Sequence, residues 1–271
     1  MGFKDVLVHL DSGARASERL ELAIGLARRH GARLTGLFAE SAVLGQSLVG
    51  RRAPEAMAQA AETARGTFEA RATAAGVTPR WWSIEPGEFS AVVAATVQCC
   101  RYVDVAVFGQ QHGDDAPVPG GLVERVIAEC GRPVLVVPSV GRYPEVGRRV
   151  LVAWTGSRES ARALHDALPL LEGAKEVTVL SLQLPRSDVA GGLPSPDVAE
   201  HLRAHGVNAT FDRTILGDLA SVDVVLNRAA DDGADLTVIG AYGLQAGGLR
   251  KRADTTRAIL ETMTTPMLLS T

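Results

Sequence analysis

Short unbroken runs of apolar residues recur along the chain, separated by longer segments in which apolar residues return every three or four positions. The runs include VLVHL, VAVFG, VLVVP, VTVLSL and LTVIG. Continuous apolar composition is typical of strands in a parallel sheet, because helices cover both faces of such a sheet. The intervening segments have the spacing of amphipathic helices. The pattern therefore predicts an α/β fold.

The whole pattern occurs twice. VLVHLD at 6–11 returns as VLVAWT at 150–155, and DVAVFG at 104–109 returns as DLTVIG at 235–240. The helical stripe after the first run also recurs, as Leu20, Ala23, Ile24 and Ala27 in one copy and Leu164, Ala167, Leu168 and Leu171 in the other. Such a repeat indicates two copies of one α/β unit.

The second copy is shorter than the first between its second strand and the end of its second helix. In the first copy, a helix of several turns is expected from Pro54 onward, because proline suits the first turn of a helix. Its counterpart is the short segment SPDVAEHLRAHG at 195–206. Each copy still reads as five strands alternating with four helices.

This order predicts two doubly wound, Rossmann-like domains in tandem, each with a five-stranded parallel sheet. The expected domains are residues 1–140 and 148–271, joined by the Pro- and Gly-containing linker PSVGRYPEVGRR at 138–149. In such sheets, ligands bind beyond the carboxyl ends of the strands, where the strand order reverses.

Composition narrows the class of function. The formal net charge is −3, which disfavours a nucleic-acid or membrane-surface binder, since those need a basic face. The sequence contains neither a signal-peptide pattern nor 18 consecutive apolar residues, so we expect a cytoplasmic protein. Cys99, Cys100 and Cys130 show no CxxC spacing, and we expect buried thiols.

The repeated segments resemble those of the universal stress proteins in their tandem, two-domain form. The resemblance spans nearly all of the chain and rests on VLVHLDS and VLVAWTGSRESARAL, DVAVFGQ and DLTVIGAYG, and RPVLVVPS and TPMLLS. It implies the adenine nucleotide alpha hydrolase-like fold and a stress-response protein whose turnover is at most slow ATP hydrolysis. It also implies that the last strands of the two domains pair, here within one chain.

Nucleotide-binding members of that family carry an acidic residue after the first strand and a glycine loop after the fourth. In the first copy these features correspond to Asp11, Gly109, Gly113, Gly120 and Gly121. Gly113 lies one residue beyond the usual place of the second loop glycine, and the loop is about two residues short. Gly120 and Gly121 precede a predicted helix, whose free N–H groups attract phosphate.

The second copy departs differently. It keeps Gly240 and Gly243 but has Thr155 in place of the acid, and Ala253 and Asp254 in place of the last loop pair. We interpret Asp254 as the N-cap of the last helix, where its carboxylate occupies the N–H groups that a phosphate needs. A phosphate ~4 Å from that carboxylate is repelled by about 4 kcal/mol at an effective dielectric constant near 20.

The first half is therefore expected to bind ATP or another adenine nucleotide with Mg²⁺. The alternative is an interaction module in which both loops are degenerate and no nucleotide binds. The resemblance also implies an unidentified protein partner, with the chain acting as a monomer with an internal pseudo-dimer or as a homodimer.

Other chemistry is not favoured by the sequence. His112, Asp114 and Asp115 are neighbours in a loop and lack a further spaced ligand, so no metal site is expected. His201 and His205 share a helix face without the glutamate of HExxH. No nucleophile elbow or catalytic triad is evident, and we expect no catalytic residue.

Overall fold

The computed structural model describes residues 2–42, 53–111, 117–183, 197–215, 221–242 and 249–271. In the first half the elements are β1 Asp5–Leu10, α1 Ala16–His30, β2 Arg33–Phe38, α2 Pro54–Ala74, β3 Pro79–Ser83, α3 Phe89–Cys100, β4 Val105–Gly109, α4 Leu122–Glu129 and β5 Val134–Val137. In the second half they are β6 Arg149–Trp154, α5 Arg158–Leu171, β7 Glu176–Gln183, α6 Val198–Ala204, β8 Thr210–Ile215, α7 Ser221–Asp231, β9 Leu236–Gly240, α8 Leu249–Thr262 and β10 Met267–Ser270.

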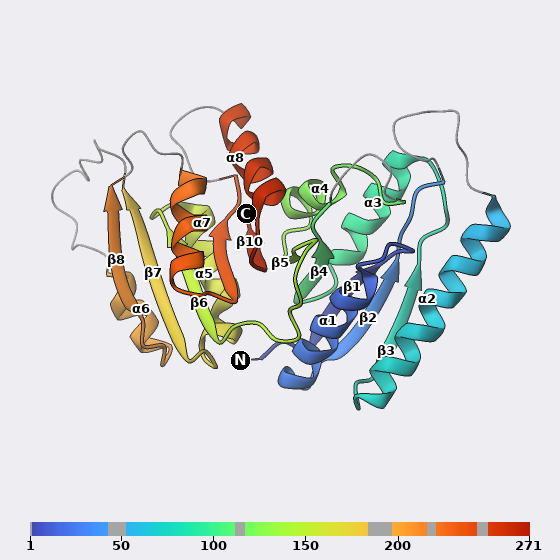
Figure 1. The fold of residues 1–271 in the computed structure, drawn as a ribbon, viewed down its shortest axis with the longest axis horizontal. Helices are drawn as coiled ribbons and strands as arrows, with labels where there is room; N and C mark the ends of the chain where they lie inside the picture. Colours follow the sequence, from blue (N-terminus) through green and yellow to red (C-terminus); the bar gives the residue numbers. More distant parts are fainter. Residues whose placement is uncertain (1, 43–52, 112–116, 184–196, 216–220, 243–248) are drawn as a thin grey trace.

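All ten strands form one sheet in the order β3-β2-β1-β4-β5-β10-β9-β6-β7-β8. Each half repeats the same doubly wound order, and its strands are parallel. The halves meet where β5 and β10 pair antiparallel, with Leu268 opposite Leu135. This pairing confirms the predicted fold and the predicted junction of the last strands. Figure 1 shows the two halves on either side of that junction, with the C-terminus at the centre.

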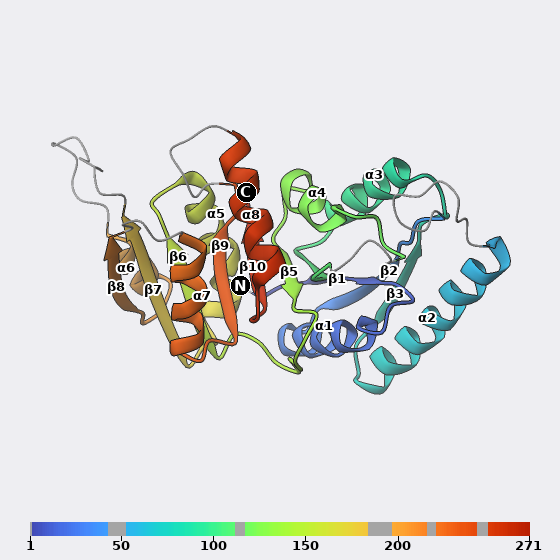
Figure 2. The ribbon, with the colours of Figure 1, turned by 45° about the horizontal axis from the view of Figure 1, so that its top comes forward.

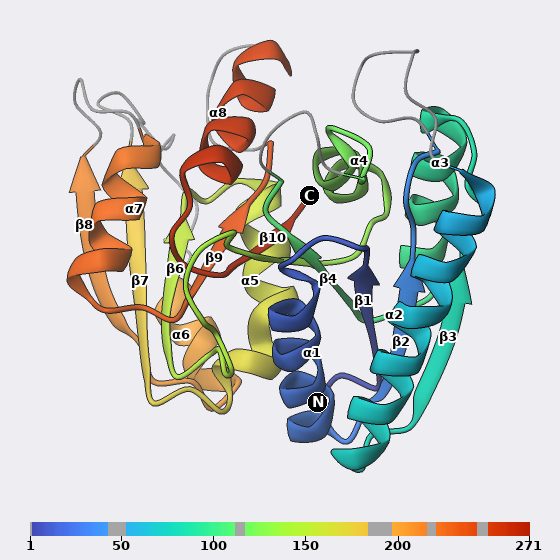
Figure 3. The same cartoon turned by 45° about the vertical axis from the view of Figure 1, so that its right-hand side comes forward.

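Two layers of helices cover the sheet. Side chains of α1, α2, α5 and α6 share one apolar cluster, whereas side chains of α3, α4, α7 and α8 share the other. Within the first half, Figure 2 shows α1 and α2 on the face opposite α3 and α4, and Figure 3 shows α1 and α2 lying over β1, β2 and β3. Each cluster contains residues of both halves, so the core is continuous across the junction.

Aspartates before the fourth strand of each half fix the start of the first strand. The Asp104 carboxylate accepts hydrogen bonds from the N–H groups of Lys4 and Asp5, at 2.6 and 3.0 Å. In the second half, the Asp235 carboxylate accepts from the N–H groups of Gly147, Arg148 and Arg149. These repeated aspartates are therefore structural, because each pairs with several backbone N–H groups at the start of a strand.

Two side chains that follow the fourth strand of each half cross the junction between the halves. Gln110 comes directly after Gly109, and Tyr242 lies two residues after Gly240. Gln110 donates to the carbonyl groups of Leu260 and Glu261 in α8. Tyr242 donates its hydroxyl proton to the carbonyl oxygen of Glu124 in α4, at 2.9 Å. Burial raises the pKa of Tyr242 to about 12, so the phenol remains a donor at neutral pH. Gln110 and Tyr242, which follow β4 and β9, are thus anchored to the last helix of the opposite half.

Several local predictions can be compared with the structure. Pro54 is the first residue of α2, as expected. Trp81 and Trp82 pack against opposite faces of the sheet. The three cysteines are free thiols, with Cys100 and Cys130 buried and Cys99 half-buried. None of the helices in the described part of the chain combines the length and apolar composition that a bilayer crossing requires.

Candidate functional site

The switch point of the first half lies between β1 and β4, where the strand order reverses. Asp11 follows β1 and Gly109 ends β4, so both residues lie at the carboxyl edge of the sheet. This edge is where doubly wound sheets bind their ligands. The residues around Asp11 and Gly109 are called the first crevice below, and those around Thr155 and Gly240 the second crevice.

Asp11 is buried in an ion pair. Arg19 Nη2 lies 2.5 Å from Asp11 Oδ2, and both side chains are 7% exposed. Asp11 Oδ1 accepts a second hydrogen bond from the N–H group of Gly13, at 2.7 Å. Arg19 also donates through Nε to the carbonyl oxygen of His9, at 3.2 Å. These contacts fix the orientation of the carboxylate at the floor of the first crevice.

His9 and Glu40 are buried beside this pair. His9 Nε2 donates to the carbonyl oxygen of Ala39 at 2.9 Å, and His9 Nδ1 lies 3.7 Å from Asp11 Oδ2. Glu40 Oε1 accepts from the N–H group of Ser12 at 2.5 Å. Four ionisable side chains therefore meet at the ends of β1 and β2, in the region where such groups typically indicate a functional site.

Burial and charge act in opposite directions on these groups. Burial lowers the pKa of His9 from its usual 6.5, and the nearby Asp11 only partly opposes this shift. Burial alone would raise the pKa of Asp11, but Arg19, His9 and the hydrogen bond from the Gly13 N–H group together outweigh burial, and the net shift is downward. At neutral pH the first crevice therefore contains a neutral imidazole beside a paired carboxylate.

The Arg19 side chain lies directly across Gly109. A Cβ atom at position 109 would be 2.6 Å from Arg19 Nη1 and 3.0 Å from Arg19 Cδ. Real Cβ atoms essentially never make contacts this short. The position of the Arg19 side chain therefore favours glycine at position 109, whether or not a ligand binds.

The start of α4 is open. Gly121 is the N-cap with φ of +76°, a conformation that favours glycine, and it provides no side-chain cap. A Cβ atom added at Gly120 or Gly121 would meet nothing within 4 Å. Among the described residues, no acceptor pairs with the N–H groups of Val123 and Glu124. This helix start retains the free donors and positive dipole end that bind anions.

In the second crevice, backbone packs directly against Gly240. A Cβ atom at Gly240 would be 2.5 Å from the carbonyl carbon of Glu159 and from the nitrogen of Ser160, at the start of α5. Ser157 caps this helix by accepting from the Ser160 N–H group. The first turn of α5 thus occupies the place over β9 that the Arg19 side chain occupies over β4.

The second crevice has no counterpart of the four-residue charged cluster; its buried carboxylate is Glu159, at the start of α5. Matching the strand registers of the two halves aligns β1 with β6, β2 with β7 and β4 with β9. The equivalents of the four side chains His9, Asp11, Arg19 and Glu40 are Ala153, Thr155, Ala163 and Gln183. None of these replacements ionises, so the charged cluster belongs to the first half.

The predicted N-cap role of Asp254 is wrong. Helix α8 begins at Leu249, which places Asp254 inside the helix rather than before it. The residues from Leu249 to Ala253 are good helix formers, so the helix extends one turn further toward its amino end than predicted.

Some sequence candidates lie outside the described residues. These are Gly113 and Gly243, together with the loop residues His112, Asp114 and Asp115. Within the described ranges, no three His, Cys, Asp or Glu side chains are arranged to hold a metal ion. His201 and His205 are edge-to-face neighbours at 4.8 Å near the end of α6. Trp154 packs partly buried against the core.

Sequence reasoning missed His9, Arg19 and Glu40. Arg19 occupies a buried position of the α1 stripe, four residues before Ala23, where an apolar side chain is expected. His9 interrupts the buried run of β1 in the same way. An ionisable residue at a buried position of a strong pattern is the signal that could have identified both.

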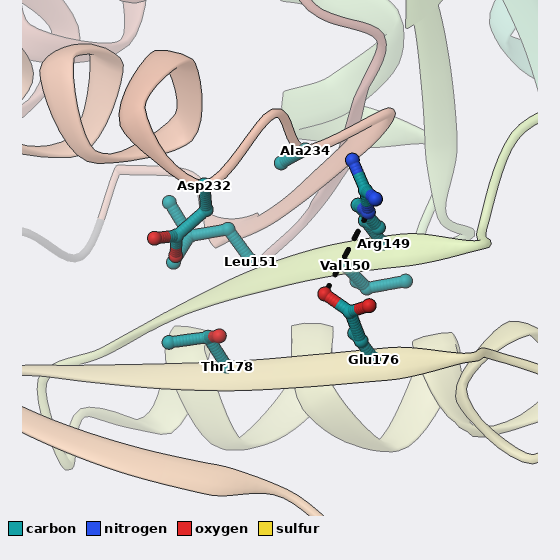
Figure 4. A pocket seen from close by; sticks show the side chains of 7 residues that line it. All are labelled: Arg149, Val150, Leu151, Glu176, Thr178, Asp232 and Ala234. Atoms are coloured by element: carbon teal, nitrogen blue, oxygen red, sulfur yellow. Dashed lines mark ion pairs between the residues drawn. The ribbon is translucent and has the colours of Figure 1, made fainter.

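A pocket of about 170 Å³ lies elsewhere in the second half. It is lined by the side chains in Figure 4, including Arg149, Glu176 and Asp232. The ion pair between Arg149 and Glu176, at 3.6 Å, is largely solvent-exposed. Arg149 and Glu176 begin β6 and β7, so the pocket lies at the amino edge of the sheet. That edge is opposite the switch point, and we do not assign the pocket to the site.

These features define a class of protein: two doubly wound α/β units that share one sheet, with an open, charged crevice in the first unit. Solved structures of universal stress proteins have this fold. One from Archaeoglobus fulgidus DSM 4304 matches with a TM-score of 0.73 and 17% identity over 98% of this chain and 95% of its own. A putative universal stress protein from Pseudomonas aeruginosa UCBPP-PA14 matches with a TM-score of 0.56 and 14% identity over 99% and 93%.

The predicted resemblance to tandem universal stress proteins is therefore confirmed in the fold. Both structures are matched along almost the whole of this chain, so the likeness includes both halves and their junction. No protein-family model matches the sequence, and no curated protein matches it significantly.

Proposed function

We propose that this chain is a universal stress protein that binds an adenine nucleotide in its first half and acts by ligand-dependent interaction, without turnover. The observation that carries the proposal is the difference between the two crevices. The first has a buried carboxylate at the switch point and an uncapped helix start, whereas in the second Thr155 replaces the acid and the α5 backbone packs against Gly240. One site per chain follows from this difference.

The residues of the first crevice fit such a ligand. The phosphates would be held by the free N–H groups of Val123 and Glu124, because a helix start stabilises negative charge. Open space at Gly120 and Gly121 allows the backbone to approach the ligand closely. Asp11 remains an acceptor for hydroxyl or amino groups, since an ionised carboxylate has about four acceptor positions and two are used here.

Thermal denaturation with ATP or AMP, each with and without Mg²⁺, tests the proposal. A ligand at 100 times its Kd stabilises the native state by about 2.7 kcal/mol, which raises the Tm of a protein of this size by about 5 °C. Gly120→Asp places a carboxylate near the phosphates and should abolish the shift, because ~4 kcal/mol of repulsion weakens binding about a thousandfold. Gly66→Asp adds the same carboxylate at an exposed position of α2, where a Cβ atom meets nothing within 4 Å, and is the matched control.

A second candidate is an interaction module that binds no nucleotide. It is favoured by the ion pair of Asp11 with Arg19, which engages the acid on which the resemblance relies. This candidate predicts that millimolar ATP or AMP leaves the Tm unchanged. It also predicts that a partner captured by the wild-type chain is still captured by Gly120→Asp. Loss of the partner with a retained fold would exclude it.

A further inference from the structure

Arg19 has donors that the ion pair does not use. Its residue is 5% exposed, Nη2 bonds Asp11 and Nε bonds the carbonyl oxygen of His9. Nη1 lies over Gly109, and no acceptor among the described residues pairs with it. A guanidinium group carries five N–H donors, so the two on Nη1 remain available to solvent or to a ligand. The arrangement leaves two N–H groups directed at the switch point.

The second half shows that the fold does not need this arginine. The equivalent position is Ala163 of α5, which is also buried. There the backbone of Glu159 and Ser160, in the first turn of α5, packs directly on Gly240, so helix and sheet meet without an arginine. Arg19 and its partner Asp11 are therefore an addition to the first half rather than a requirement of the architecture.

We infer that Arg19 and Asp11 form a donor–acceptor pair that determines which ligand the first crevice accepts. This inference rests on the proposed function, in which phosphates bind at the start of α4. The opposite end of the ligand then meets Nη1 of Arg19 as a donor and the Asp11 carboxylate as an acceptor. A purine edge or a ribose hydroxyl carries the matching acceptor and donor groups, so the pair recognises the base–sugar end of a purine nucleotide.

The experiment compares Arg19→Lys with wild type, using ATP, GTP, adenosine and guanosine as probes in thermal denaturation and calorimetric titration. Lysine keeps a positive charge beside Asp11, but its compact ammonium cannot bond Asp11 and also occupy the position of Nη1. A lost hydrogen bond to a charged donor weakens binding about 10- to 100-fold. We expect that loss for the best nucleotide and for its nucleoside. Arg28→Lys, at an exposed position on the same helix, is the control and should bind as wild type.

Nucleosides separate this inference from the proposed function because they lack phosphates. Gly120→Asp should weaken nucleotide binding but not nucleoside binding, whereas Arg19→Lys should weaken both. Unchanged nucleotide affinity in Arg19→Lys would overturn the inference and leave the nucleotide site standing. Arg19-dependent binding of a nucleoside, with no gain from its phosphates, would support the inference and overturn the phosphate site. Failure of all four probes to bind wild type would overturn both.

The neutral double variant Asp11→Asn/Arg19→Met covers the case in which Arg19→Lys does not fold. It removes both charges together, so neither is left buried without its partner. A double variant that folds and has lost the nucleoside response supports the inference. One that binds nucleosides as wild type does contradicts it.

Discussion

The glycines of the two crevices differ in the space around them. Gly109 and Gly240 belong to the motif by which the chain resembles nucleotide-binding proteins, yet both are packed against other groups. Gly120 and Gly121 border open space. Sequence motifs report residue types, and only the structure separates a glycine needed for packing from one that could admit a ligand.

Replacing these glycines by alanine should reveal the difference. Gly240→Ala forces a Cβ atom into the backbone of α5, which cannot move aside, so we expect a loss of about 1–3 kcal/mol or more in the free energy of unfolding. Gly109→Ala should cost less, because a side chain rather than backbone must shift. Gly120→Ala should remain within about 1 kcal/mol of wild type. Urea denaturation measures all three, and equal losses at Gly120 and Gly240 would contradict the packing assignment.

His9 gives stability a dependence on pH. Burial lowers its folded pKa below 6.5, so the folded and unfolded chains are both neutral at His9 above that pH. As the pH falls below 6.5, His9 is protonated in the unfolded chain but stays neutral in the folded chain. The free energy of unfolding therefore falls by up to about 1.4 kcal/mol per pH unit. His9→Gln removes this titration, so its free energy of unfolding should fall less between pH 7 and pH 5.5.

Denaturant midpoints at several pH values test that prediction. His30 acts in the same direction, because burial lowers its pKa too, and it therefore contributes to the pH dependence of both proteins. The informative quantity is the difference between wild type and His9→Gln. Identical pH dependence in the two proteins would show that His9 is not held neutral by the fold.

At the scale of elements, the sequence predicted the order of strands and helices, because an apolar pattern that spans a whole strand or helix is little affected by single residues. The switch point at Asp11 and the helix start at Gly121 were also predicted. The start of α8 was not, because Asp254 is a good N-cap by type but stands after a run of good helix formers. The packing of the α5 backbone on Gly240 could not be predicted, since it depends on how closely α5 approaches β9.

The charged cluster shows a second limit of sequence reasoning. His9, Asp11 and Arg19 lie within 11 residues of one another in the sequence, but Glu40 joins them only because β1 and β2 are neighbours in the sheet. Periodicity assigns a residue to a face, whereas an ion pair requires the distance between two particular side chains. The Arg19–Asp11 contact therefore needed the three-dimensional structure.

At the scale of the whole molecule, the two halves should unfold together. One sheet and both apolar clusters run through the β5–β10 junction, so separating the halves exposes two edge strands and part of each cluster. We expect one calorimetric transition with a van't Hoff enthalpy close to the calorimetric enthalpy. Gly240→Ala should shift that transition as a unit. Two resolved transitions would show that the halves are stable independently.

The central claim is that one molecule contains one nucleotide site and that this site lies in the first half. Isothermal titration calorimetry with ATP and Mg²⁺ tests it most directly, on wild type, Gly120→Asp and Thr155→Val. We predict one site per chain in wild type and in Thr155→Val, and no detectable binding in Gly120→Asp. Two sites per chain, or a site that persists unchanged in Gly120→Asp, would contradict the account.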